Sequence, residues 1–192
     1  MLINLIRSMH DGVFGTIEKL ANGWFLELAA RFVFAGVLMV YYLHSASLKV
    51  GSGIAGFFQP SFSAYIQILT EQVMVSYDLE IANIPFYLKV VVYMGTYAEF
   101  LLPILIVIGL FTRVAALGMI VFICVQSYVD VFLLGVDAST VGALFDRESG
   151  SAIVDQRTLW IFVLLVLVVK GGGALSVDRI LSGMFPRKSE AA

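Results

Sequence analysis

Four stretches of the sequence are each long and apolar enough to cross a lipid bilayer as a helix, and this feature constrains the fold most strongly. A spanning helix needs about 20 mostly apolar residues. The stretches cover about residues 24–44, 87–110, 112–134 and 157–173. Of the 192 residues, 60% are apolar and 14% charged, and a soluble domain of this size could not bury so much apolar surface. We therefore predict an all-α integral membrane four-helix bundle that forms a single domain over residues 1–192.

Residues 1–23, which precede the first predicted span, have a different pattern. Apolar residues recur at helical spacing from Leu2 to Leu20, and most charged residues fall on the opposite side. This pattern is typical of an amphipathic helix that lies in the membrane interface instead of crossing it. A second apolar face runs from Phe62 to Tyr77, which predicts a further helix against the membrane surface or over one end of the bundle.

The basic residues are unevenly divided between the two ends of the predicted bundle. One end carries Arg7, Lys19, Arg113, Lys170, Arg179, Arg187 and Lys188. The other end carries fewer basic residues and most of the acidic ones. Because cytoplasmic loops collect lysine and arginine, both chain termini are expected in the cytoplasm. The second and third spans are almost contiguous, so they should be antiparallel neighbours.

Two ionisable residues stand out inside the predicted spans. Glu99 falls near the middle of the second span, and Arg31 falls within the first. An ionisable group at the bilayer centre costs about 2.5–3.5 kcal/mol on insertion scales, so it usually faces the bundle and has a partner. We predict an intramembrane pair between Arg31 and Glu99. Glu27 lies four residues before Arg31 and offers an alternative pair on one helix face. Either pair would hold the helices in register or serve function directly.

A second polar cluster is predicted within about two helical turns of the outer interface. Its members are His44, Lys49, Lys89, Tyr93, Gln126 and Asp130. Together they would line a pocket open to the outer leaflet, and such a pocket suits the head of a quinone. His44, Tyr93 or a lysine can donate hydrogen bonds to quinone carbonyls, and Asp130 can exchange protons. Residues of these types near helix ends also act as interfacial anchors without any ligand.

Several classes of site are disfavoured by the sequence. Cys124 is the single cysteine, which excludes an internal disulfide and a paired-cysteine redox motif. His10 and His44 have no partners at ligand spacing, so we expect no metal site. The net charge of −2 points to neither nucleic acid nor an anionic membrane surface as a partner. We expect no intrinsic cofactor.

Several different short motifs follow one another across residues 28–182. They are Arg31 and Gly36, then Lys49, then the Tyr97–Pro103 stretch around Glu99, then Gly109–Arg113 followed by Ala115–Leu117, and last a glycine-rich stretch before Leu175–Asp178. In order and spacing these motifs resemble the DoxX family of small four-helix membrane proteins. The residues that match the family pattern are Arg31, Lys49, Glu99, Arg113 and Asp178. The first connection, residues 50–86, is longer than is usual in that family, and Leu175 stands where an aromatic residue is expected.

This resemblance implies a bacterial inner-membrane subunit associated with oxidoreductases. Relatives in the family are linked to thiosulfate oxidation coupled to quinone reduction, or to thiol-based oxidative-stress complexes. Our leading hypothesis is a redox-associated subunit that binds quinone or docks an oxidoreductase partner, which would carry the cofactor. One alternative is a non-enzymatic scaffold or assembly factor that docks through residues 60–80. Another is a small transporter, which would require a homo-oligomer and for which no inverted repeat is visible.

Overall fold

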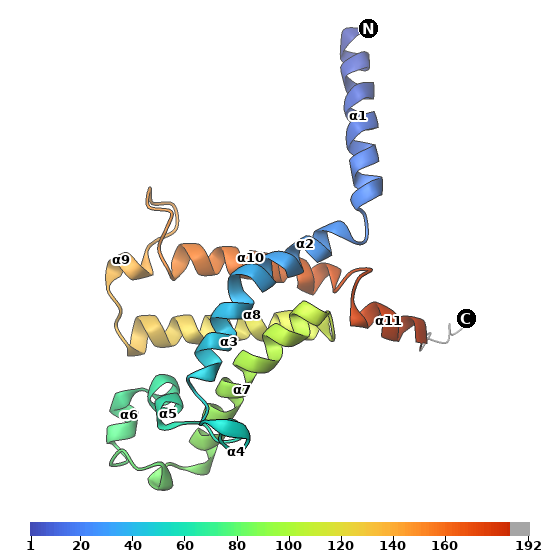
Figure 1. Ribbon diagram of the computed structural model, residues 1–192. Helices are drawn as coiled ribbons and strands as arrows, with labels where there is room; N and C mark the ends of the chain where they lie inside the picture. Colours follow the sequence, from blue (N-terminus) through green and yellow to red (C-terminus); the bar gives the residue numbers. More distant parts are fainter. Residues whose placement is uncertain (185–192) are drawn as a thin grey trace, which may run out of the picture.

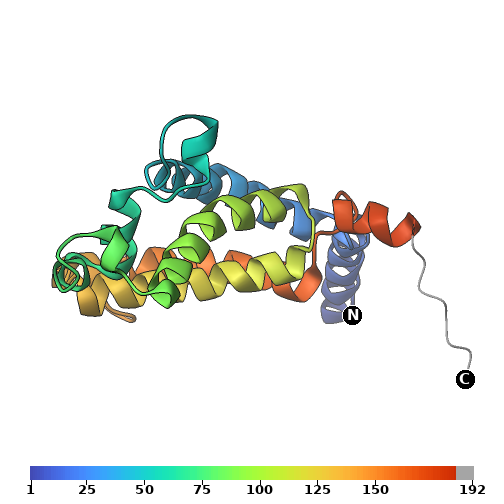
Figure 2. The ribbon, with the colours of Figure 1, turned by 90° about the horizontal axis from the view of Figure 1, so that it is seen from below.

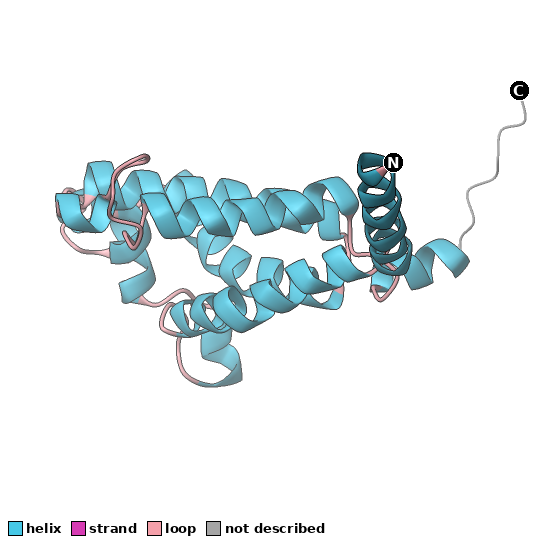
Figure 3. Cartoon of the chain, turned by 90° about the horizontal axis from the view of Figure 1, so that it is seen from above, coloured by secondary structure: helices cyan, strands magenta, loops and turns pink. Residues whose placement is uncertain are grey.

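The computed structural model describes residues 1–184, and all regular secondary structure in that range is helical (Figure 3). Arg187 and Lys188, which entered the charge argument, lie outside the described residues. Three helical segments are long and apolar enough to cross a membrane, namely Phe25–Ser47, Phe86–Ile108 and Thr112–Leu133. The prediction of an all-α membrane protein is confirmed. A further helix, α10 (Val154–Lys170), has 17 residues.

The first long segment is bent at a π-helical turn. It consists of α2 (Phe25–Phe34), the π-turn η1 (Ala35–Met39) and α3 (Val40–Ser47). Turns of this type commonly kink a helix, because one residue is inserted into the regular hydrogen-bond ladder. As a result α2 packs against α10, whereas α3 leaves that direction and packs against α7 (Figure 1).

A tight turn joins the second and third long segments. The second is α7 (Phe86–Ile108), and the third combines α8 (Thr112–Tyr128) with the π-turn η3 (Val129–Leu133). Gly109 ends α7 with a left-handed φ of +73°, a conformation that favours glycine. The turn sends α8 back along α7, and α10 then lies antiparallel beside α8 (Figure 1).

The connection between α3 and α7 is folded, not extended. It contains α4 (Gly53–Phe57), α5 (Phe62–Leu69), α6 (Glu71–Val75) and η2 (Ile81–Asn83). The apolar face predicted from Phe62 to Tyr77 is thus divided between two helices, which are separated at Thr70 by a left-handed φ of +73°. These helices pack on the N-terminal half of α7 through a small core of their own, formed by Ala64, Tyr65, Leu69, Met74, Ile84 and Val92.

The segment around α4 forms a closed loop beside the middle of α7. The Ser61 amide donates to the Lys49 carbonyl over 2.8 Å, which closes the loop at its base. The Tyr97 hydroxyl on α7 donates to the Phe57 carbonyl over 2.8 Å. This contact holds the loop against the middle of α7, away from the start of that helix at Phe86. The chain therefore returns toward the middle of the bundle after α3 ends.

The main core fills the space between α2, α7, α8 and α10. Its buried members are Ala30, Phe34, Leu38, Tyr42, Ile106, Ala115, Ala116, Met119, Ile123, Leu164 and Leu167. Ala115 and Ala116 are at most 1% exposed, and small residues of this kind allow helices in membranes to approach closely.

The helices at the two ends of the chain stand at the edge of the bundle. Helix α1 (Leu2–Ala21) has no buried residue, and it projects across the direction of α8 and α10 instead of along it (Figures 1 and 2). Helix α11 (Val177–Met184) lies near the start of α2. At the opposite end of the bundle, the short α9 (Ala138–Val141) is capped by the Asp137 carboxylate, which accepts hydrogen bonds from Ser139 and Thr140.

Candidate functional site

A buried ion pair links the end of the first long segment to the middle of α7. The Lys49 Nζ lies 2.7 Å from both carboxylate oxygens of Glu99, and it also donates to the Ser45 Oγ over 2.8 Å. The two charged side chains are 5% and 7% exposed. Charge-assisted bonds of this length are among the stronger ones in proteins. Glu99 therefore has a partner inside the bundle, as expected for an intramembrane carboxylate.

The predicted Arg31–Glu99 pair is wrong. Arg31 instead donates from Nη1 to the carbonyls of Gly172 and Leu175, over 2.9 and 2.7 Å. The bend at η1 is the physical reason, because it leaves Arg31 on α2 against the end of α10 while it carries Lys49 to α7. The alternative Arg31–Glu27 pair is also not formed within residues 1–184, where the buried Glu27 Oε2 has no hydrogen-bond partner.

A cavity of about 610 Å³ lies between α3, α5, α7 and α8, with the Lys49–Glu99 pair in its wall. Most lining residues are apolar. The polar and charged side chains in the wall are Tyr41, Ser45, Lys49, Gln67, Glu99, Gln126 and Asp130. Two apolar lining residues are strongly exposed on the outside of the bundle, Met94 on α7 at 69% and Val121 on α8 at 56%. The cavity therefore adjoins the surface that faces lipid.

Gln126 ties two tyrosines of the first segment to α8. Its side-chain oxygen accepts from the Tyr42 hydroxyl over 3.3 Å, and its side-chain nitrogen donates to the Tyr41 hydroxyl over 3.2 Å. The Tyr41 ring also lies 5.8 Å from the Trp160 ring on α10, measured between centroids. Because Tyr41 accepts from Gln126, its own hydroxyl proton is available to a ligand.

A second ion pair adjoins the cavity through Asp130, which lines it. Arg157 on α10 donates from Nη2 to Asp130 in η3 over 2.5 Å, and from Nη1 to the Ser127 Oγ over 2.9 Å. The Arg157 side chain is 9% exposed and that of Asp130 22%. Arg157 was not predicted as a site residue. A signal was available, because Arg157 begins the fourth predicted span and Asp130 lies near the end of the third.

The predicted outer cluster is only partly assembled. Lys49, Gln126 and Asp130 line the cavity, whereas His44, Lys89 and Tyr93 do not. His44 is exposed, and Lys89 donates to the Ala82 carbonyl over 3.3 Å. Tyr93 is 39% exposed and packs beside Tyr97. These three predictions are wrong because interfacial depth alone does not tell which helix face meets the cavity.

Asp178 organises the end of the bundle that is opposite the cavity. Its carboxylate accepts from the amides of Phe111 and Thr112 over 2.7 and 2.9 Å, and from the Thr112 hydroxyl over 2.7 Å. Three donors at the start of α8 are thereby satisfied, which is what a helix-capping acid does. Its backbone amide donates to the Gly109 carbonyl over 2.8 Å. The family-pattern residue Asp178 thus holds the turn between α7 and α8.

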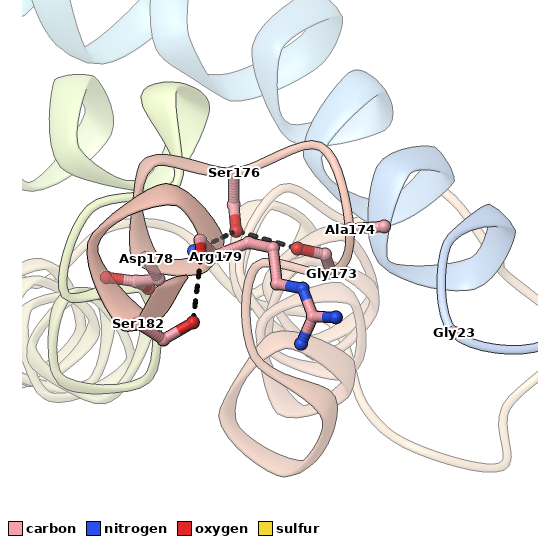
Figure 4. A pocket seen from close by; sticks show the side chains of 7 residues that line it. All are labelled: Gly23, Gly173, Ala174, Ser176, Asp178, Arg179 and Ser182. Atoms are coloured by element: carbon pink, nitrogen blue, oxygen red, sulfur yellow. Dashed lines mark hydrogen bonds between the residues drawn. The ribbon is translucent and has the colours of Figure 1, made fainter. Parts of the chain in front are cut away.

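The glycines at this junction leave little space for side chains. A Cβ on Gly109 would lie 2.5 Å from the Ser176 Cβ and 2.6 Å from the Arg31 Nη1. Arg113, another family-pattern residue, approaches Gly171 closely, with its Nε 3.3 Å from where a Cβ would stand. Figure 4 shows a neighbouring pocket of about 440 Å³, lined by Gly23, Gly173, Ala174, Ser176, Asp178, Arg179 and Ser182. Its hydrogen bonds brace the chain between α10 and α11.

Comparisons with known proteins define neither a family nor an activity. No protein-family model matches the sequence, and no solved structure matches it. An uncharacterised protein of Haemophilus influenzae is 27% identical over 96 residues, which is 48% of this chain and 54% of that protein. The chain thus spans about half the length of this curated relative. Any functional conclusion must therefore come from the site itself.

Proposed function

We propose that this chain is a DoxX-like membrane subunit of an oxidoreductase system, and that its cavity holds the head of a quinone. The observation that carries the proposal is the 610 Å³ cavity, which is mostly apolar and has the Lys49–Glu99 pair and the ion-paired Asp130 in its wall. Cavities that bind small ligands typically measure about 300–1,000 Å³ and combine apolar walls with a few placed polar groups.

The charges of the cavity favour an uncharged ligand. Each charged side chain in its wall has a partner of opposite charge: Lys49 and Glu99 pair with each other, and Asp130 pairs with Arg157 of α10 behind the wall. A charged ligand would leave one of these buried groups without a counter-charge, which is unfavourable. A neutral ring with carbonyl oxygens can instead accept hydrogen bonds from the Tyr41 hydroxyl, and from Lys49 in place of the Ser45 hydroxyl.

Access from the bilayer also fits a lipophilic carrier. The cavity adjoins the lipid-facing sides of α7 and α8, where Met94 and Val121 are exposed. A quinone could enter laterally from the membrane with its head foremost and leave its tail in lipid. Because no intrinsic cofactor is expected, the electrons would come from a partner oxidoreductase that carries one.

The membrane placement belongs to the same proposal. We assign α10 as a fourth span, since its 17 residues measure about 25 Å and it packs closely along α8. We place both chain termini on the cytoplasmic side of a bacterial inner membrane, following the distribution of basic residues. Helix α1 would then lie in the cytoplasmic interface, because it runs across the bundle direction and buries none of its apolar face in protein.

Fluorescence of Trp160 gives a direct test of ligand binding. Its ring lies 5.8 Å from that of Tyr41, which lines the cavity. In a Trp24→Phe background, Trp160 is the sole tryptophan. A short-chain ubiquinone added to this protein in lipid nanodiscs should quench its fluorescence in a saturable manner.

A matched pair of variants distinguishes the cavity from the general lipid surface. Val121→Phe inserts a ring into the cavity wall. It should lower the affinity for quinone by about tenfold or more, and tenfold is equivalent to about 1.4 kcal/mol of binding free energy. Val114→Phe makes the same change two turns earlier on α8, outside the cavity and 72% exposed, and should leave binding unchanged. Quenching that rises linearly without saturation, or equal saturation in both variants, would contradict the proposed site.

A further inference from the structure

The two carboxylates of the cavity differ in how far their side chains are exposed. Glu99 and Asp130 both line the same 610 Å³ space. The Glu99 side chain is 7% exposed and that of Asp130 22%. We propose that Glu99 exchanges protons with the outer aqueous side through Asp130, and that this route is closed toward the cytoplasm. The inference rests on the proposed quinone site and names how that site receives its protons.

The groups that face these carboxylates suit such a route. Glu99 faces Lys49 and Ser45 from the first segment, and Asp130 faces Arg157 from α10. Gln126 lies in the wall with them. A water molecule occupies about 30 Å³ of liquid and needs polar partners, so the cavity has room for a hydrogen-bonded file of water along these side chains. Chains of acidic side chains inside membranes commonly relay protons.

Within residues 1–184, the layer of the bundle directly inward of Glu99 is apolar, and the buried Glu27 and Arg31 lie beyond it. Between Glu99 and the turn at Gly109, the face of α7 that points into the bundle is formed by Pro103 and the fully buried Ile106. Ala116 and Met119 of α8 are also 0% exposed. Beyond this layer, Arg31 and Asp178 are held by backbone groups of the junction. Among the described residues, the cavity wall includes no residue of that junction.

The mouth of the route is formed by the π-turn η3. Asp130 is the second residue of this turn, and its carbonyl accepts from the Val136 amide over 3.2 Å in the connection that follows. Arg157 fixes the orientation of the carboxylate from the side of α10. Asp130 therefore stands at the boundary between the cavity and the outer connection, where a group that passes protons is required.

The chemistry of the proposed ligand requires such a supply. Reducing one quinone to a quinol takes two electrons and two protons, and each carbonyl oxygen becomes a hydroxyl. In the proposal, both electrons come from the redox cofactor of the partner oxidoreductase, and both protons come from outer water by way of Asp130. The Lys49–Glu99 pair is restored when Glu99 has passed its proton on and has been left as a carboxylate.

Infrared spectroscopy after a pH jump tests this route without any quinone. The protein in lipid nanodiscs is brought rapidly to lower pH, and the carboxyl band of Glu99 is identified by its loss in Glu99→Gln. Asp130→Asn should slow the rise of this band by about a hundredfold, the lower end of what a positioned acid–base group contributes. Asp146→Asn, in the exposed outer connection, should keep the original rate. Asp130→Glu should restore it, which separates a lost carboxyl from a damaged fold.

The outcomes separate the route from the ligand. An unchanged rate in Asp130→Asn, or no Glu99 band at any pH at which the protein is folded, overturns the inference. Trp160 quenching measured on the same variants reports quinone binding independently. If the quinone fails to bind but the Asp130→Asn rate falls, the route stands and the proposed ligand is wrong. If the quinone binds and the rate is unchanged, the ligand stands and the route is wrong.

Discussion

Replacing Lys49 with methionine should destabilise the protein by about 3–5 kcal/mol, the usual consequence of removing one partner of a buried ion pair. In the variant, the Glu99 carboxylate would lose the donor that lies 2.7 Å from both of its oxygens. With only 7% of its side chain exposed, water in the cavity could replace only part of this interaction. Methionine retains an unbranched stem of similar length, so little packing should be lost.

The double variant Lys49→Met/Glu99→Met separates charge from packing. Replacing both members of a buried pair by apolar groups is often neutral or stabilising, so this variant should lie within about 1 kcal/mol of the original protein. The resulting coupling energy should exceed about 3 kcal/mol, well above the deviation of about 0.5 kcal/mol expected for independent sites. The free energy of unfolding can be measured by reversible denaturation in mixed micelles, followed by Trp160 fluorescence and helical circular dichroism.

Lys89→Met provides the control, because it removes a lysine whose bond is a single contact of 3.3 Å to a carbonyl. It should change stability by no more than about 0.5 kcal/mol. A Lys49→Met variant as stable as this control would refute a stabilising role for the ion pair. A double variant whose loss of stability equals the sum of the two single losses would refute it as well, since the two residues would then contribute through packing or general polarity instead of mutual charge.

Two further predictions concern backbone conformation and helix capping. Gly109→Ala should destabilise the protein by roughly 1–3 kcal/mol, because a left-handed φ is strained for alanine and its Cβ would clash at the junction. Gly12→Ala on α1, where a Cβ would meet no side chain or other segment within 4 Å, should leave the unfolding midpoint unchanged or slightly raised. Equal losses in both variants would contradict a role for strain at Gly109. The hydrogen bonds from Ser139 and Thr140 lower the pKa of Asp137 from 3.8 to about 2. The stabilisation of α9 by this carboxylate should therefore be complete above pH 3.8 and be lost as the pH falls through about 2. Amide hydrogen exchange in α9 that shows no loss of protection over this interval would exclude that role.

The positions of the long helices were predictable because solvation by lipid acts on each apolar residue in turn. The predicted stretches 87–110 and 112–134 lie within two residues of the helices Phe86–Ile108 and Thr112–Leu133. The last stretch was placed three residues too late. Ser151 and Asp155 exchange backbone-to-side-chain hydrogen bonds of 2.9 and 3.2 Å, and this local capping begins α10 before the apolar run does.

The pairing of the charges was not predictable from depth along straight helices. Counting residues placed Lys49 at the outer interface and Glu99 near the bilayer centre, yet their side chains meet. The bend over residues 35–39 directs α3 across α7. In the sequence, Gly36 is the one residue in this stretch that favours a bend. Lys49, Gln126 and Asp130, which were grouped by expected depth, line one cavity. Arg157 was not singled out, because its contact depends on which faces of α8 and α10 meet.

The contacts of Arg31 set the order in which the chain can be assembled. Its carbonyl partners lie 141 and 144 residues later in the sequence. At a synthesis rate of about 5–20 residues per second, they are made roughly 7–30 s after Arg31 itself. During that interval the first span resides in the membrane with an unsatisfied guanidinium, and the Lys49–Glu99 pair cannot form until α7 follows. Until the C-terminal residues have been synthesised, the guanidinium of Arg31 therefore depends on the translocation machinery or on snorkelling toward the interface. Deleting residues 172–192 would consequently remove both carbonyl partners of Arg31 and so destabilise the first span.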